Sequence, residues 1–275
     1  MIGNDISLQR LKITKNLINK YQNKNIFLLN EDARNLPEKF EMKRFIKTEN
    51  EHIYKYEKKG KLEEEKRLSI DKVLVDVECS HDGSFKHILK YFGGHPSRRQ
   101  KSGKGEVRVL SNREKKRRAK QAQNSTKKLK SKSRFHKVNQ KENNWTVEDF
   151  KQRVMDKERL STICDLQRDI LLKAVQVVRR GGVVVYSTCS LSKKQNEEVV
   201  ESTLSTVNKN ASLDYSLELE GVFEGCKELQ KLGVKEGNLK KTYRLLAGKH
   251  SASAMFLAKI LKVPRSISPK KYNET

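Results

Sequence analysis

The sequence is poor in cysteine, proline and aromatic residues and has no long apolar run. Its 275 residues include four cysteines and four prolines, and only 7% of them are aromatic. No CxxC pair occurs, so the spacing predicts no metal cluster. The longest apolar run, around 183–186, is too short to span a membrane, and the first ten residues lack a signal-peptide core. These absences predict a soluble intracellular protein whose thiols are unpaired.

Acidic residues are scarce as well. The chain has 34 Asp and Glu against 60 Lys and Arg, which gives a formal net charge of +26. A field of that sign attracts polyanions, and nucleic acid is the first candidate. An anionic membrane surface is a weaker candidate, because no basic amphipathic helix with a broad apolar face is present.

More than half of this charge lies in one stretch. Residues 97–141 contain 18 Lys or Arg and two acids, with sparse, unperiodic apolar residues. We interpret 97–144 as a basic low-complexity insertion that binds RNA phosphates or acts as a nuclear-targeting segment. A plain solvated insertion stays an alternative, and the scarcity of aromatics argues against base readout. The residues predicted to bind RNA are Arg113, Lys115, Lys116, Arg117, Arg118 and Lys120.

Outside the insertion, apolar patterns predict alternating strands and helices. This order predicts an α/β fold with a mostly parallel sheet covered on both faces, which binds ligands at the carboxyl ends of its strands. The stretch 39–65 fits no element. The expected strands end near residue 5 and cover 26–29, 73–77, 183–186, 245–246 and 254–260, and the expected helices cover 8–21, 160–178 and 196–204.

Polar residues follow several of these strands. Asp5, Asp32 and Asp76 each close an apolar run, so we expect all three at one edge of the sheet. Cys79 and Cys189 also come just after apolar strands, so both thiols are expected at that edge. Plainer interpretations remain, since Asp5 fits an N-cap and a lone cysteine is most often a buried small hydrophobe.

Two cysteine motifs resemble those of the Sun family of RNA cytosine-5 methyltransferases. The stretch 185–191, Val-Tyr-Ser-Thr-Cys-Ser-Leu, is followed by Asn-Glu-Glu at 196–198, like the family's Thr-Cys nucleophile and the helix after it. The stretch 74–83 resembles its Asp-Ala-Pro-Cys-Ser-Gly motif. Residues 3–11, 32–34 and 166–171 also match family segments. The resemblance covers 1–91 and 160–261 in the family's order.

The resemblance implies a Rossmann-like class I fold that transfers a methyl group from S-adenosylmethionine to carbon 5 of a cytosine in rRNA or tRNA. It implies that Cys189 is the nucleophile, that Cys79 releases the product and that Asp76 positions the base. It assigns cofactor binding to Asp5, Arg10, Asp32 and Asp76. A monomer in the nucleus or nucleolus is expected, with mitochondrion and cytoplasm left open. The target base must be unpaired or flipped out.

Two features depart from the family. Its first strand and Gly-rich loop have no counterpart here, so we expect a domain truncated at its N-terminus. Glu78 stands where the family has proline, and His81 where it has glycine. A carboxylate beside Cys79 predicts a raised pKa for that thiol through like-charge repulsion.

The expected organisation is a first part of the methyltransferase domain at 1–96, the insertion at 97–144, a second part at 145–262 and a tail at 263–275. Two other functions stay open. One is an inactive RNA-binding ribosome-assembly or scaffold protein. The other is a DNA cytosine-5 methyltransferase, whose nucleophile would be Cys79. Cys164 and Cys226 are expected to be structural.

Overall fold

The computed structural model describes residues 1–22, 25–50, 52–57, 67–85, 87–88, 146–222, 233–245 and 253–265. The chain divides into two compact units, residues 1–88 with 151–275 and residues 89–150. The predicted RNA-binding residues of the basic insertion and Cys226 lie outside the described residues. The sheets and the long helices described below belong to the first unit.

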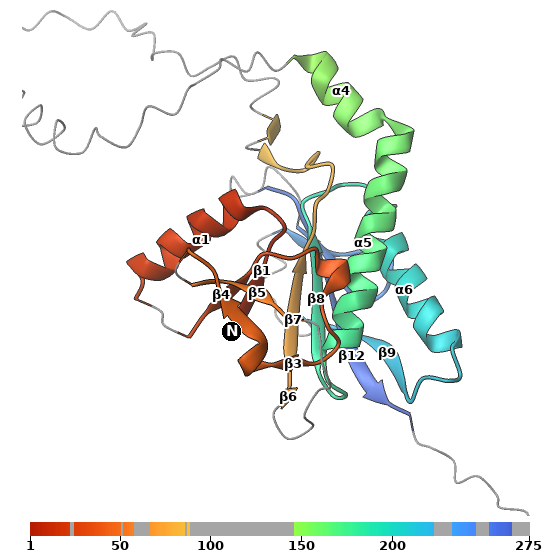
Figure 1. The fold of residues 1–275 in the computed structure, drawn as a ribbon. Helices are drawn as coiled ribbons and strands as arrows, with labels where there is room; N and C mark the ends of the chain where they lie inside the picture. The colour runs from red at the N-terminus through yellow and green to blue at the C-terminus, as the bar shows by residue number, and fades with distance from the viewer. Residues whose placement is uncertain are drawn as a thin grey trace, which may run out of the picture. The chain divides into compact units, whose positions relative to one another are not determined.

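The N-terminal part forms a four-stranded sheet in the order β1-β2-β5-β4 (Figure 1). Its strands are β1 (Ile2–Asn4), β2 (Phe27–Leu29), β4 (Phe45–Lys47) and β5 (Ile53–Tyr56), with β1, β2 and β5 parallel. Helix α1 (Leu8–Lys20) starts at Ser7, whose side chain accepts a hydrogen bond from the Arg10 amide. Its buried Leu11 and Ile18 pack with Leu28 and Ile53.

Short elements flank this sheet. Two 3-10 turns, η1 (Ala33–Asn35) and η2 (Met42–Arg44), follow β2 and β3. Strand β3 (Phe40–Glu41) pairs with β6 (Arg67–Leu68) as a separate two-stranded sheet. The buried aromatic rings of Phe40 and Tyr56 meet edge to face, with centroids 5.2 Å apart, which joins these elements to the four-stranded sheet.

The second large sheet has the order β10-β11-β12-β8-β7, and β9 also pairs with β12. The long strand β12 (Met255–Pro264) can hold three neighbours because β9 and β11 pair with different parts of it. Among the described strands of this sheet, only β7 and β8 are parallel. The other strands are β7 (Lys72–Asp76), β8 (Val183–Thr188), β9 (Tyr215–Glu220), β10 (Val234–Glu236) and β11 (Thr242–Leu245).

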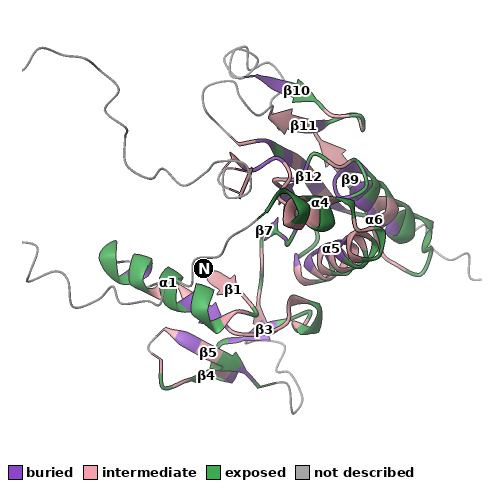
Figure 2. Cartoon of the chain, turned by 90° about the horizontal axis from the view of Figure 1, so that it is seen from above, coloured by how far each residue is buried: buried purple, intermediate pink, exposed green. Residues whose placement is uncertain are grey.

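Helices α5 (Lys157–Val177) and α6 (Glu197–Lys209) cover this sheet and bury its core. Helix α4 (Val147–Met155) is followed by α5, which starts at the capping side chain of Asp156. Leu171 and Val200 from the helices pack with Tyr186, and Figure 2 shows the buried residues gathered between helices and strands. From β12, Lys262 donates hydrogen bonds to the carbonyls of Val175 and Val178, which closes the end of α5.

The α/β class and the predicted elements are confirmed, whereas the strand directions are mixed. The short strands β4, β5, β9 and β10 were not predicted, and the strands after β8 pair antiparallel. Within the described residues β1 pairs only with β2 and β7 only with β8, so the predicted strands fall in two sheets. Strand β7 is also less buried than its apolar sequence indicated, since Leu74 is 71% exposed.

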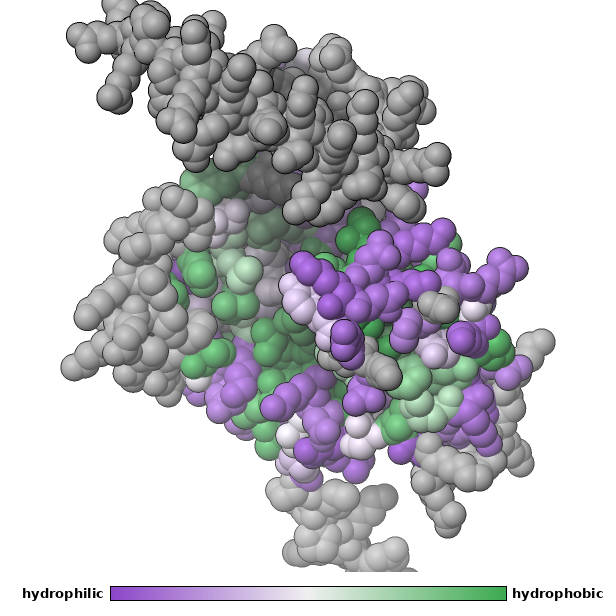
Figure 3. All heavy atoms as spheres, turned by 90° about the vertical axis from the view of Figure 1, so that its left-hand side faces the viewer, coloured by the Kyte–Doolittle hydropathy of each residue, from purple (hydrophilic) through white to green (hydrophobic). Residues whose placement is uncertain are grey.

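The described surface carries both charge and exposed apolar side chains. Figure 3 shows one face on which apolar side chains gather beside strongly polar ones. No helix within the described part of the chain is long and apolar enough to cross a bilayer.

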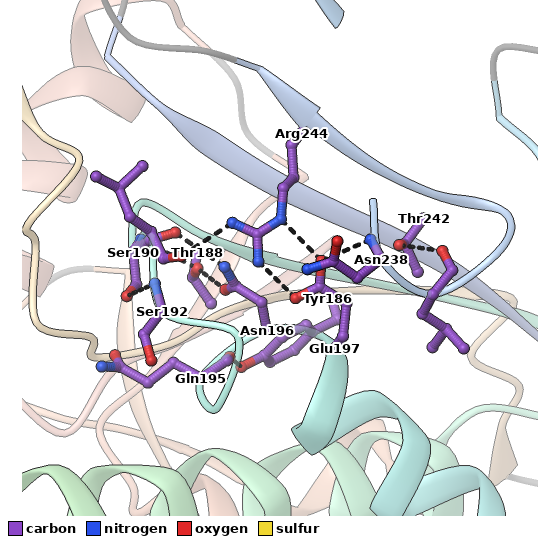
Figure 4. A network of polar contacts seen from close by, with 12 residues as sticks. Tyr186, Thr188, Ser190, Ser192, Gln195, Asn196, Glu197, Asn238, Thr242 and Arg244 are labelled. Atoms are coloured by element: carbon purple, nitrogen blue, oxygen red, sulfur yellow. Dashed lines mark hydrogen bonds and ion pairs between the residues drawn. The ribbon is translucent and has the colours of Figure 1, made fainter. Parts of the chain in front are cut away.

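A buried ion pair ties α6 to β11. Arg244 donates two hydrogen bonds to the fully buried carboxylate of Glu197, at 2.8 and 2.5 Å (Figure 4). The amide of Asn238 donates a further one. Burial alone would raise the pKa of Glu197, but the Arg244 contact outweighs burial and lowers that pKa. The carboxylate is therefore held ionised inside the protein.

We expect Arg244→Met to lower the free energy of unfolding by about 3 kcal/mol at neutral pH, because it leaves the Glu197 carboxylate buried without its cation. A pKa that is lowered on folding stabilises the protein above the unfolded pKa, and this contribution is lost as pH falls through the folded pKa. The difference between wild type and variant should therefore shrink as pH drops below the ordinary pKa of glutamate. Urea unfolding at several pH values measures both effects.

Arg168→Met is the matched control, because Arg168 pairs with Asp165 on the exposed side of α5. We expect it to change the free energy of unfolding by less than about 1 kcal/mol, with little dependence on pH. Equal losses in the two variants would mean that the Glu197 pair has no special part in holding α6 to β11.

Candidate active site

Two thiols meet at the carboxyl ends of the parallel strands β7 and β8. The register places Asp76 beside Ser187, with Cys79 and Cys189 just beyond. Their Sγ atoms are 3.3 Å apart, although 110 positions separate them in the sequence. The prediction that both thiols lie at one edge of the sheet is confirmed.

The two thiols differ in exposure. Cys79 is fully buried at 0% exposure, whereas Cys189 is half-buried. Cys189 is therefore the residue of the pair that keeps contact with solvent.

His81 completes the cluster. Its Nδ1 lies 3.0 Å from Sγ of Cys189 and 3.5 Å from Sγ of Cys79. Its backbone φ is +59°, in the left-handed region that glycine adopts without strain. The ring also stacks on His87, with centroids 4.4 Å apart and planes 11° from parallel. The histidine at this position thus has an uncommon backbone conformation and a ring held by stacking.

The close contact between the two sulfurs shifts the pKa values of the two thiols in opposite directions. The hydrogen bond from Cys189 and the neighbouring His81 outweigh burial and lower the pKa of Cys79 to about 4. The same contact with Cys79, together with burial, raises the pKa of Cys189. Both directions describe two sulfurs that share one proton, so the pair loses its first proton easily and its second with difficulty.

The expected effect of Glu78 on Cys79 is therefore wrong. We predicted a raised pKa for Cys79 from like-charge repulsion, and the pKa is lowered. The reason is geometric, because the Glu78 carboxylate points away to Arg159, 3.7 Å from its guanidinium, and is 58% exposed.

Asp76 ends β7 next to the thiols. The residue as a whole is exposed, while partial burial of its carboxyl group, followed by the charge of Cys79, raises its pKa. A carboxyl group with a raised pKa can be protonated and donate a hydrogen bond, as well as accept one.

A second layer of polar side chains holds the two cysteine loops against each other. The hydroxyls of Ser80 and Ser190 lie 2.9 Å apart, one residue after each cysteine. Gln195 accepts a hydrogen bond from the amide of Ser80 and donates one to its hydroxyl. These residues were not predicted from the sequence, although the repeated Cys-Ser pair at both strand ends was a signal for them.

Asn196 fixes the loop that carries Cys189. It precedes α6, but its side chain makes no capping hydrogen bond. It instead accepts from the hydroxyl of Thr188 at 2.5 Å and donates to the carbonyl of Ser190 at 2.9 Å (Figure 4). The Asn of the motif therefore clamps the residues on either side of Cys189.

Gly83 allows the first cysteine loop to approach the second. Its amide donates to the carbonyl of Cys189 at 3.1 Å, and its carbonyl accepts from Ala254 at 2.8 Å. A Cβ atom at this position would lie 2.7 Å from both the Cys189 carbonyl oxygen and the Ala254 Cβ. No larger residue fits without moving the two loops apart.

Two of the predicted cofactor-binding acids lie on the first sheet, after the parallel strands β1 and β2. Asp5 accepts hydrogen bonds from the Ser7 amide and from Arg10. These hydrogen bonds outweigh burial and lower the pKa of Asp5. Asp32 caps η1 and pairs with Arg34. Asp76 belongs to the other sheet, so the three acids do not share one sheet edge as predicted.

Residues 148–261 match a family model described as 16S rRNA methyltransferase RsmB/F. Over 213 residues the chain is 23% identical to the multisite-specific tRNA:(cytosine-C(5))-methyltransferase trm4b of Schizosaccharomyces pombe, covering 78% of this chain and 21% of that protein. Over 97 residues it is 33% identical to the tRNA (cytosine(72)-C(5))-methyltransferase of Pyrococcus horikoshii, covering 35% and 21%.

The crystal structure of NSun6 from Pyrococcus horikoshii with SFG superposes with a TM-score of 0.50 at 21% identity, covering 95% of this chain and 41% of that one. This likeness supports the predicted Rossmann-like fold. The chain spans about a fifth or less of the length of the curated relatives it matches. Residues 148–261, with the Cys189 loop, match the RsmB/F family model, in agreement with the resemblance of the cysteine motifs to the Sun family.

Proposed function

We propose that this chain carries the catalytic thiols of an S-adenosylmethionine-dependent RNA cytosine-5 methyltransferase. The observation that carries the proposal is the pair of sulfurs 3.3 Å apart at the ends of β7 and β8, one half-buried and one fully buried. One thiol can attack a base while the other stays behind it as a proton acceptor.

Cys189 is the nucleophile in this proposal. A thiolate, and not a thiol, adds to carbon 6 of the cytosine ring. Because the pair loses its first proton easily, movement of the remaining proton from Cys189 to Cys79 leaves the thiolate on the more exposed sulfur. Addition to carbon 6 makes carbon 5 electron-rich, and Asp76 would hold the ring nitrogen and amine by accepting or donating a hydrogen bond.

The cofactor supplies the methyl group that carbon 5 receives. Asp5 and Asp32 fit its hydroxyl and adenine donors, because both are acceptors at the ends of parallel strands. Arg10 would then leave Asp5 or share it with the ligand, which is feasible because the Arg10 side chain is 66% exposed.

Product release requires a base. After methyl transfer the proton on carbon 5 must leave, so that the bond between Cys189 and carbon 6 can break and return the sulfur as a thiolate. Cys79 would first give the proton that it took from Cys189 to His81, whose Nδ1 lies 3.5 Å from its sulfur. The resulting Cys79 thiolate, next to Cys189, would then accept the proton from carbon 5. The glycine that the family usually has at this position has no side chain, so this role depends on the histidine at position 81.

The RNA is rRNA or tRNA in this proposal, held by phosphate contacts from the basic insertion in a nuclear or nucleolar setting. The two alternative functions lose support. A DNA-type enzyme would need Cys79 as nucleophile, and that sulfur is fully buried. An inactive scaffold would not need two thiols, a histidine and an acid at one strand edge.

We expect Cys79→Ser to accumulate a covalent protein–RNA adduct, because the nucleophile remains and the base that permits release is weakened. Cys189→Ser should form no adduct and transfer no methyl group. Denaturing gels with labelled RNA measure the adduct, and transfer from labelled S-adenosylmethionine measures turnover. An adduct in Cys189→Ser that is lost in Cys79→Ser would reverse the two roles.

Cys164→Ser is the matched control for these variants. Cys164 lies on α5, outside the cluster, and burial raises the pKa of its thiol. We expect it to transfer methyl groups within about twofold of wild type, because a thiol with a raised pKa is a poor nucleophile.

Cofactor binding by the chain of 275 residues is a separate test. We expect micromolar binding of S-adenosylmethionine by calorimetry, weakened at least tenfold in Asp5→Ala, because the carboxylate that accepts ribose hydroxyls is removed. Asp165→Ala, an exposed acid on α5, should leave binding unchanged. Binding that is insensitive to Asp5→Ala would contradict the assignment of this acid.

A further inference from the structure

We propose that Cys79, His81 and Cys189 form a binding site for one zinc ion. The three side chains offer two thiolate sulfurs and one imidazole nitrogen, and these three atoms all lie within 4.8 Å of one another. Thiolate and imidazole are the ligands that zinc prefers, and a Cys₂His set with one open position is a known coordination pattern for this ion.

The spacing of the three atoms suits a tetrahedral ion. With the usual zinc–sulfur and zinc–nitrogen bond lengths, two tetrahedral sulfurs lie roughly 3.8 Å apart and a sulfur and a nitrogen roughly 3.6 Å apart. The observed separations are 3.3 Å between the sulfurs, and 3.5 and 3.0 Å from Nδ1 of His81 to Cys79 and Cys189. Each differs from the tetrahedral value by no more than about 0.6 Å, so small side-chain rotations suffice.

The surroundings favour a cation. Two thiolates with sulfurs 3.3 Å apart repel each other, and a divalent ion bound between them would offset that repulsion. Asp76, paired with Ser187 at the same strand ends, adds an acidic group close to the site. The half-buried positions of His81 and Cys189 leave a way in and a fourth ligand position for water.

Two structural features of His81 favour its role as a zinc ligand. Its ring is stacked on His87, so the side chain has little rotational freedom left to lose when it binds a metal ion. Its positive φ directs the side chain to the sulfurs at a conformational cost that glycine would avoid. The sequence indicated no metal site because it has no CxxC pair, and the two cysteines come together only through the pairing of β7 with β8.

This inference does not rest on the proposed function, since it needs neither RNA nor cofactor. A zinc ion at this site would occupy both thiolates and block a nucleophile. Metal binding and methyl transfer would then exclude each other. Failure of methyl transfer leaves the metal proposal intact, and failure of metal binding leaves the transfer proposal intact.

Titration of the reduced, metal-free chain with Co²⁺ tests the site, because thiolate-to-cobalt charge-transfer absorption reports sulfur ligation. We expect one equivalent to bind, to be displaced by Zn²⁺, and to protect Cys189 from iodoacetamide. His81→Gly should weaken binding more than about tenfold, since it removes one ligand while relieving the backbone. Cys79→Ala and Cys189→Ala should each abolish the charge-transfer band.

Cys164→Ser is the control and should bind Co²⁺ like wild type. Circular dichroism checks that His81→Gly keeps the fold, and glycine suits its backbone conformation. The proposal is overturned if the wild-type chain gives no charge-transfer band. It is equally overturned if the band survives in Cys79→Ala and Cys189→Ala, or if His81→Gly binds as tightly as wild type.

Discussion

The parallel pairing of β7 with β8 is the constraint on which the site depends. It is the one parallel pairing among the described strands of the second sheet, and it puts the carboxyl ends of two strands side by side. The chain between these strands contains the basic insertion and α5, so the pairing must close a long loop. The core beneath it, formed by Tyr186, Leu171 and Val200, offsets that entropy.

The polar groups around the thiols follow from this pairing. Ser80 and Ser190 meet because each follows a cysteine at a strand end, and Gln195, just before α6, exchanges hydrogen bonds with Ser80. Each is buried and would cost free energy without its partner, so the network favours a single arrangement of the loops. Gly83 permits the same close approach from the backbone side, because a Cβ atom there would lie only 2.7 Å from the Cys189 carbonyl oxygen.

The sequence predicted the elements that have strong periodicity and the residues that lie in motifs. Helix α5 and strand β8 were expected within a few residues, and the meeting of Cys79 with Cys189 followed from the rule that ligands collect at strand ends. The short strands β4 and β5 were missed because they lie in the charged stretch 39–65, which shows no apolar run of the kind that marked β2. The exposure of Leu74 was missed because an apolar run does not reveal that its strand lies at an edge.

The acidity of the thiols could not be predicted from neighbours in the sequence. Glu78 is bonded to Cys79 through the chain, yet its side chain turns to Arg159, while Cys189 and His81 control the pKa of Cys79 through space. In the proposed reaction, the same asymmetry gives the two sulfurs different roles. Burial keeps Cys79 from a bulky base but not from a proton, and partial exposure lets Cys189 meet either a cytosine ring or a metal ion. His81, which contacts both sulfurs, affects each of these reactions.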